Sequence, residues 1–129
     1  MTPTQMILTA IFALIAFLVI RRMIVLKGVK HYTPEEVAAK LRAGEAVVLL
    51  DVRTDAERQH GSITPSIHIP MPQVRARLAE LKKHAEMEII CYCAVGTRSA
   101  PVAAMLQRHG FRAANMKGGL AAWKSSGLR

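Results

Sequence analysis

The hydrophobic pattern begins with a continuous apolar segment that holds no ionisable side chain. Fourteen of the fifteen residues from Met6 to Ile20 are apolar. A helix of this length spans about 22 Å at roughly 1.5 Å per residue, which is less than the ~30 Å hydrocarbon core of a bilayer. Arg21 and Arg22 can extend their charges to the headgroups, so the apolar element continues through residues 23–26 to about 21 residues. The pattern predicts one tilted transmembrane helix.

After this segment, short unbroken apolar runs alternate with apolar residues at helical spacing. The run 46–50 is unalternating and β-branched, as expected of a strand buried on both faces of a parallel sheet. Further strands are predicted over 66–69, 88–92 and 113–116, and helices over 33–43, 72–84, 99–109 and 120–125. The alternation predicts an α/β fold in which helices flank a small parallel sheet, preceded by one transmembrane helix.

The length of 129 residues allows one soluble domain. We expect a membrane anchor over residues 1–26, a juxtamembrane linker over 27–32 and a single domain over 33–129. Glycines 118 and 119 are expected in a turn that requires positive φ.

The charge is unevenly distributed along the chain. Eighteen Lys and Arg against nine Asp and Glu give a net charge of +9, and every charged side chain lies at or after Arg21. Four basic residues follow the apolar segment without an acidic one among them: Arg21, Arg22, Lys27 and Lys30. By the positive-inside rule this cluster predicts a single-pass protein whose C-terminal domain lies in the cytoplasm.

Two interpretations of the N-terminal region remain open at this point. A cleaved signal peptide needs positive charge before its apolar run, so the sequence favours a retained anchor. The basic cluster is expected to be a simple stop signal rather than a site for lipid recognition. The other basic residues are dispersed along the chain, and no series of aromatic residues accompanies them. This pattern argues against nucleic-acid binding.

The candidate chemistry lies around the two cysteines. Cys91 and Cys93 are so close together that a disulfide between them would close almost no loop and could not stabilise a small secreted fold. A disulfide-rich scaffold is therefore excluded. Cys93 follows the predicted strand 88–92, at the sheet edge where open parallel sheets bind ligands. A loop that contains Gly96 then leads to Arg98 at the start of a helix. Its backbone amides and the helix terminus would form an anion-binding nest, which would lower the pKa of the Cys93 thiol and make it a nucleophile.

Structural interpretations compete with this one. A free cysteine is commonly a small buried hydrophobe, and we expect that role for Cys91, inside the strand. A metal site is disfavoured because Cys91 and Cys93 have no second ligand pair nearby. The histidines are scattered along the chain, at His31, His60, His68, His84 and His109. No metal or cofactor is expected.

Several blocks, taken in order, carry a resemblance to a known family. They are residues 50–53 (Leu-Asp-Val-Arg), 61–70, the loop 93–99, and 118–123 (Gly-Gly-Leu-Ala-Ala-Trp). From about residue 31 to 129 the chain resembles a single rhodanese domain of the sulfurtransferase superfamily. It departs from the family where Gly-His-Ile-Pro-Gly-Ala is usual, because residues 61–66 read Gly-Ser-Ile-Thr-Pro-Ser.

The resemblance implies a cysteine that takes sulfane sulfur from a small anionic donor such as thiosulfate. The resulting persulfide passes its sulfur to a thiol or cyanide acceptor. By position, Cys93 is the persulfide carrier, and the substrate cradle consists of Ala94, Val95, Gly96, Thr97, Arg98 and Ser99. Asp51 and Arg53 are supporting residues, of which Asp51 is expected to organise loops through hydrogen bonds rather than to react.

Two other functions compete with sulfur transfer. Cysteine phosphatases also place a thiolate in a nest closed by arginine, but they have five residues between cysteine and arginine, whereas four lie between Cys93 and Arg98. A noncatalytic binding or regulatory module at the membrane is opposed only by the presence of Cys93. The sequence favours a membrane-tethered sulfurtransferase and predicts no particular protein partner.

Overall fold

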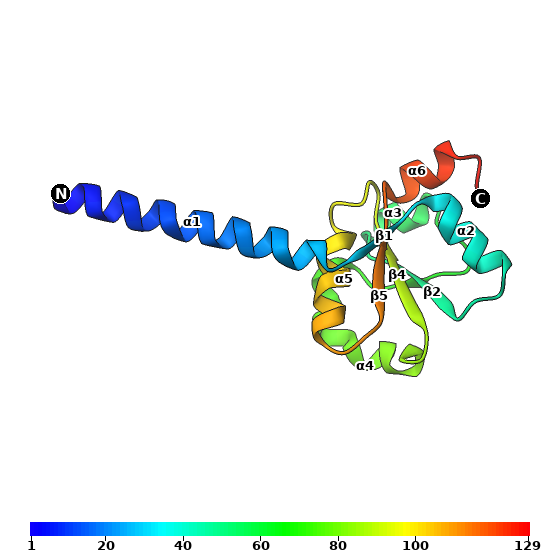
Figure 1. The fold of residues 1–129 in the computed structure, drawn as a ribbon. Helices are drawn as coiled ribbons and strands as arrows, with labels where there is room; N and C mark the ends of the chain where they lie inside the picture. Colours follow the sequence, from blue (N-terminus) through cyan, green and yellow to red (C-terminus); the bar gives the residue numbers. More distant parts are fainter.

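The computed structural model describes residues 1–129, apart from the side chains of residues 25–27. Helix α1 (Pro3–Lys27) projects from the rest of the molecule as a single rod (Figure 1). Within it, Pro3–Ile24 is long and apolar enough to cross a membrane, and none of this stretch is buried. By length and composition α1 is therefore a candidate membrane span. The predicted contributions of Val25, Leu26 and Lys27 to the span and to the basic cluster lie outside the described side chains.

The domain is built on one parallel sheet, which confirms the predicted fold class. Its strands lie in the order β1, β5, β4, β2, β3, and every neighbouring pair is parallel. Their bounds are Lys30–Tyr32 for β1, Val47–Asp51 for β2, Ile67–His68 for β3, Glu88–Tyr92 for β4 and Ala113–Met116 for β5. The fully buried strand β4 lies at the centre of the sheet.

Helices cover both faces of the sheet, and each face has its own hydrophobic core. Helices α2 (Pro34–Arg42) and α6 (Gly119–Ser125) pack on one face, where Leu49, Ile90 and Trp123 are buried together. Helix α5 (Ser99–Arg108) and the segment 71–84 pack on the other, around Leu50, Ile89 and Leu106. Adjacent strand residues thus point into opposite cores, as the unbroken apolar runs require.

Two segments differ from the expectation. Residues 30–32 were assigned to the linker but form the edge strand β1, which pairs with β5. Residues 72–84 were predicted as one helix but form short turns: η1 (Met71–Gln73), η2 (Arg75–Arg77), α4 (Leu78–Leu81) and η3 (Lys82–His84). The spacing of Val74, Leu78 and Leu81 alternates steps of four and three, which suits both a continuous helix and successive tight turns.

One short helix was not predicted. Helix α3 (Asp55–Gln59) follows β2 and begins at a capping box, in which Thr54 Oγ1 accepts from the Glu57 amide while the Glu57 carboxylate accepts from the Thr54 amide, each at 3.2 Å. The box fixes the start of α3 directly beside the carboxyl edge of the sheet.

Candidate active site

The carboxyl ends of the two central strands bring the candidate residues to one edge of the sheet. Asp51, the last residue of β2, lies in register with Tyr92, the last residue of β4. Cys93 follows Tyr92 directly, and the loop 94–98 connects it to α5. The Asp51–Arg53 segment and the cysteine loop, 40 residues apart in sequence, therefore meet at this edge.

The Cys93 thiol lies at the base of the loop, fully buried. Its Sγ accepts hydrogen bonds from the Gly96 amide at 3.1 Å and from Ser99 Oγ at 3.3 Å. Burial alone would raise the pKa of this thiol, but hydrogen bonds from the Ser99 hydroxyl and from the amides of Ser99, Arg98 and Gly96 outweigh burial and lower it. The arrangement stabilises a thiolate without a histidine base.

The hydroxyl of Ser99 extends this network away from the thiol. Ser99 Oγ also lies 2.6 Å from Asn115 Oδ1, and Asn115 Nδ2 lies 3.1 Å from His31 Nδ1. Because a hydroxyl has one proton, Ser99 shares it between the Cys93 sulfur and the Asn115 carbonyl. Neither Asn115 nor His31 was predicted at the site; a polar Asn inside a buried strand was the available signal.

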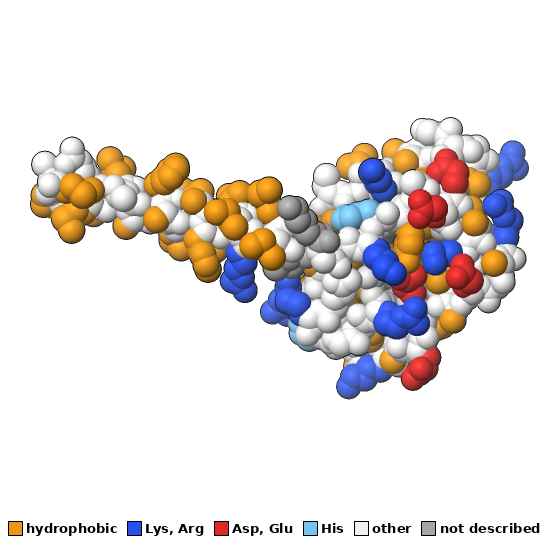
Figure 2. Space-filling view, in the orientation of Figure 1, with side chains coloured by type: hydrophobic (Ala, Val, Ile, Leu, Met, Phe, Trp, Pro, Cys, Tyr) orange, Lys and Arg blue, Asp and Glu red, His pale blue; other side chains and the backbone are white. Residues whose placement is uncertain are grey.

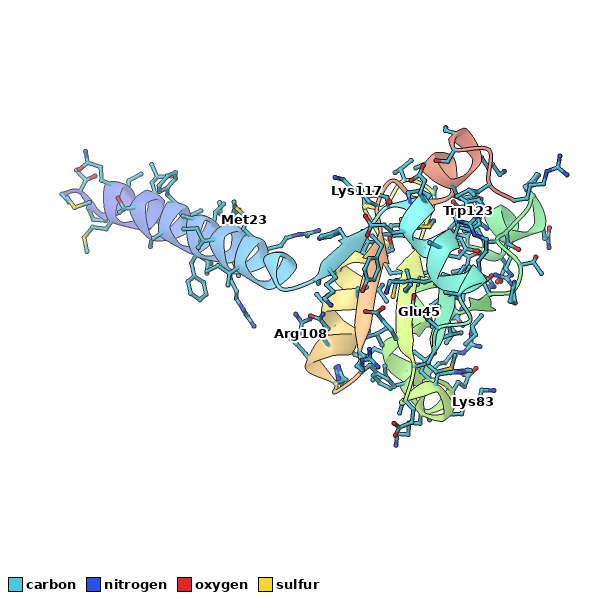
Figure 3. All side chains as sticks on the ribbon, turned by 45° about the vertical axis from the view of Figure 1, so that its right-hand side comes forward. Met23, Glu45, Lys83, Arg108, Lys117 and Trp123 are labelled. Atoms are coloured by element: carbon cyan, nitrogen blue, oxygen red, sulfur yellow. The ribbon has the colours of Figure 1, made fainter. Side chains whose placement is uncertain are left out.

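Helix α6 is hydrogen-bonded to the start of the active-site loop. The amides of Leu120 and Ala121 donate to the carbonyls of Cys93 at 2.8 Å and Ala94 at 3.0 Å. As predicted, the turn before them has positive φ, +77° at Gly118 and +61° at Gly119. A Cβ at Gly119 would overlap the Cys93 carbonyl oxygen and would lie 2.6 Å from the Ala94 carbonyl carbon and 2.7 Å from its oxygen. Only glycine allows α6 to approach the loop this closely, while buried Trp123 packs α6 into the core (Figure 3).

Arg98, expected in the substrate cradle, is engaged by a carboxylate. Its Nη1 and Nη2 donate to Glu57 Oε1 and Oε2 at 2.7 and 2.8 Å. These bonds to Arg98 lower the pKa of Glu57 to about 2. Both side chains are about one-third exposed, so the pair lies at the rim of the site. Glu57 was not predicted at the site; the Thr54-x-x-Glu57 capping box was the only local signal for its position.

Asp51 and Arg53 form a buried scaffold beside the thiol. Arg53 Nε and Nη2 donate to the two carboxylate oxygens of Asp51 at 3.0 and 2.8 Å, and Nη2 also donates to the Gly61 carbonyl at 2.7 Å. Burial opposes ionisation of Asp51, but the bonds from Arg53 dominate and lower its pKa. Tyr92 Oη donates to the same carboxylate at 3.2 Å. These residues fix the loops rather than contact the sulfur.

Arg58 and Ser66 complete this scaffold at the segment that departs from the family pattern. Arg58 Nη1 donates to Asp51 Oδ2 at 3.2 Å and to Ser66 Oγ at 3.0 Å. Arg58 Nη2 donates to the Ser66 carbonyl at 3.1 Å. The turn over residues 61–66 is thus fixed to β2 by arginine side chains.

The remaining candidate residues are three loop residues and the second cysteine. Val95 and Thr97 are exposed on the loop, and Ala94 is half-buried. Burial raises the pKa of the Cys91 thiol, so this cysteine stays protonated inside β4. Among the residues whose side chains are described, no group of three His, Cys, Asp or Glu side chains is placed to hold a metal ion.

Comparisons with known proteins identify related sequences and folds. Residues 33–126 match the family described as "Rhodanese-like domain". A protein named "Sulfurtransferase" from Allochromatium vinosum is 34% identical over 101 residues, which cover 78% of this chain and 92% of that protein. The structure of a rhodanese-like domain protein from Staphylococcus aureus matches with a TM-score of 0.69 and 36% identity, over 78% of this chain and 96% of that one.

A larger solved protein contains a similar domain. The structure of a thiosulfate sulfurtransferase from Pseudomonas aeruginosa matches with a TM-score of 0.72 and 30% identity. The match covers 80% of this chain but 20% of that one.

Proposed function

Because this chain belongs to the rhodanese-like domain family, we propose that it is a membrane-tethered sulfurtransferase that carries sulfane sulfur as a persulfide on Cys93. The observation that supports this most directly is the environment of the thiol. A cysteine whose pKa is lowered by backbone amides and a serine hydroxyl, at the start of a helix, is equipped as a nucleophile.

The proposed reaction has two displacement steps at sulfur. The Cys93 thiolate attacks the outer sulfur of thiosulfate, the sulfur–sulfur bond of the donor breaks, and sulfite leaves with the electron pair. The terminal sulfur of the persulfide carries negative charge, which hydrogen bonds from the loop amides would stabilise. A cyanide or thiolate acceptor then attacks the terminal sulfur, and Cys93 leaves as a thiolate. No external oxidant or reductant is required.

Arg98 would contribute by attracting the anionic donor. Two of its N–H groups are committed to Glu57, but a guanidinium has five donors. The pair keeps Arg98 beside the rim of the loop, and an arriving anion would share the guanidinium with the carboxylate. The exposure of about one-third for both side chains is compatible with this rearrangement.

The spacing of the loop argues against the phosphatase alternative. Four residues separate Cys93 from Arg98, one fewer than in cysteine phosphatases, and the Arg98 guanidinium is paired with Glu57. A shorter ring of amides suits a small group on the sulfur better than a tetrahedral phosphate.

The test is intact-mass measurement of the full chain in detergent before and after thiosulfate. We expect a mass increase of one sulfur atom, removed by cyanide with formation of thiocyanate. Cys93→Ser should abolish both effects, and Cys91→Ser should retain both as the matched control. If Cys93→Ser still gained sulfur, the site assignment would be wrong, and if the unmodified chain gained none, the module would be noncatalytic.

The proposed topology needs a separate test. We propose that α1 anchors the chain and that the domain faces the cytoplasm, supported by the basic residues Arg21 and Arg22 after the apolar stretch. Reporters active only inside or only outside the cytoplasm would be fused after Arg129. Activity of the inside reporter alone is expected; activity of the outside reporter alone would reverse the orientation.

A further inference from the structure

A hollow of about 420 Å³ lies where α1 meets the domain, and four arginine side chains line it. They come from three separate elements: Arg21 and Arg22 from α1, Arg75 from η2, and Arg108 from α5. Figure 3 shows Arg108 on α5, beside the domain-proximal part of α1. We call this feature the arginine hollow; its apolar lining consists of Leu18, Pro101 and Ala104.

The four guanidinium groups are not neutralised by the protein. All four side chains are exposed, and no carboxylate among the described side chains lies within 4.0 Å of them. The other buried or rim arginines, such as Arg53 and Arg98, each have a carboxylate partner. Gathering four unpaired positive charges around one hollow raises the local potential, which favours an anion there.

The position of the hollow indicates which anion. Arg21 and Arg22 follow the apolar run 6–20 and lie near the end of the candidate span Pro3–Ile24. In a spanning helix their long side chains would therefore carry the charges to the headgroups. Leu18, one helical turn earlier, adds an apolar wall on the hydrocarbon side. Figure 2 shows Lys and Arg side chains under this end of α1 and on the adjoining face of the domain. The hollow thus has an apolar wall toward the hydrocarbon and a cationic lining at the level of the headgroups.

We propose that the arginine hollow binds the phosphate group of an anionic phospholipid in the leaflet that faces the domain. Planar guanidinium groups bind phosphate oxygens through paired hydrogen bonds. A simple stop signal would need only the charges on α1, whereas the fold adds Arg75 and Arg108 to them. This inference rests on the membrane anchor proposed above, and it assigns to the lipid the role of seating the domain against the bilayer.

The test uses the full chain in neutral detergent micelles. Dihexanoyl phosphatidylglycerol, dihexanoyl phosphatidylcholine and glycerol phosphate would be titrated separately while arginine side-chain N–H signals are followed by NMR. We expect saturable binding of phosphatidylglycerol alone. Arg75→Gln combined with Arg108→Gln should weaken it about 25-fold, since each basic residue near a lipid surface contributes about fivefold.

A charge-matched variant controls for net charge. Arg42 and Arg129 are exposed and take no part in the hollow, so Arg42→Gln combined with Arg129→Gln should bind as tightly as the unmodified chain. Equal weakening in both double variants would reduce the effect to net charge and overturn the inference. Binding of glycerol phosphate as tight as that of phosphatidylglycerol would identify a site for free phosphate instead.

Flotation with neutral phosphatidylcholine proteoliposomes separates this inference from the anchor. If the chain floats but shows no preference for the anionic lipid, the anchor stands and the lipid site is wrong. If the chain does not float, the anchor fails and the lipid site fails with it. Sulfur transfer to cyanide in detergent does not depend on either outcome.

Discussion

Replacing Gly119 with alanine tests how closely α6 must approach the active-site loop. The new Cβ would lie nearest to the Cys93 carbonyl oxygen and 2.6 Å from the Ala94 carbonyl carbon, whereas ordinary contact begins at 3.4 Å, so α6 or the loop must move by at least about 0.8 Å. A misplacement of about 1 Å can cost on the order of 100-fold in rate. We therefore expect kcat/KM for thiosulfate to fall at least about tenfold.

Stability should fall as well, for two separable reasons. The left-handed backbone at Gly119 costs an alanine roughly 1–2 kcal/mol, and the overlap with Ala94 adds about 1–3 kcal/mol. Gly110 is the matched control, because its φ is +87° but a Cβ there would meet nothing within 4 Å. Gly110→Ala should lose only the backbone contribution and keep its activity.

The assays are thermal unfolding by circular dichroism and thiocyanate formation at a temperature where both variants are folded. In a domain of about 100 residues each kcal/mol shifts Tm by roughly 4–8 °C. Gly119→Ala should therefore melt clearly below Gly110→Ala. If the two variants had equal Tm and equal activity, the close approach of α6 to Ala94 would have no part in shaping the loop.

Further predictions concern the groups around the loop. Arg98→Ala should mainly raise KM for thiosulfate and Arg98→Lys should rescue only partly; unchanged kinetics would remove Arg98 from the site. Ser99→Ala should move the pH profile of Cys93 alkylation to higher pH, because a donor to the thiolate is lost; an unmoved profile would refute that role. Glu57 has its pKa lowered from 4.5 to about 2, so its pairing stabilises the fold above about pH 4.5 and is lost as the pH falls toward 2. Glu57→Gln should flatten the change in Tm over that range, and an unchanged slope would contradict the pairing.

The central part of the fold could be predicted because its signals are local. The unbroken apolar runs that become β2 and β4 are recognisable without neighbours, and Cys93 follows the second of them directly. Strand β1 could not be found in the same way, because Lys30, His31 and Tyr32 carry no apolar pattern and become a strand by pairing with the distant strand β5.

The partners of the site residues depend on long-range contacts. Arg98 meets Glu57 across 41 positions, and Asn115 meets His31 across 84. No spacing rule connects residues so far apart, so only folding shows that Arg98 is already paired. The prediction of one helix over 72–84 was wrong for a different reason. The apolar spacing of this segment fits two backbone geometries, and long-range packing selects between them.

The short connection between α1 and β1 has a consequence for the choice of acceptor. Only Gly28 and Val29 separate the two elements, and Val29 is buried in the core. Three peptide links reach about 10 Å, less than the ~13 Å radius of gyration of a domain of about 100 residues. With α1 in a bilayer, this short connection would keep Cys93 within a thin layer next to the membrane surface. Acceptors held in the same layer would meet it at a raised effective concentration, so location would select among acceptors without any added affinity.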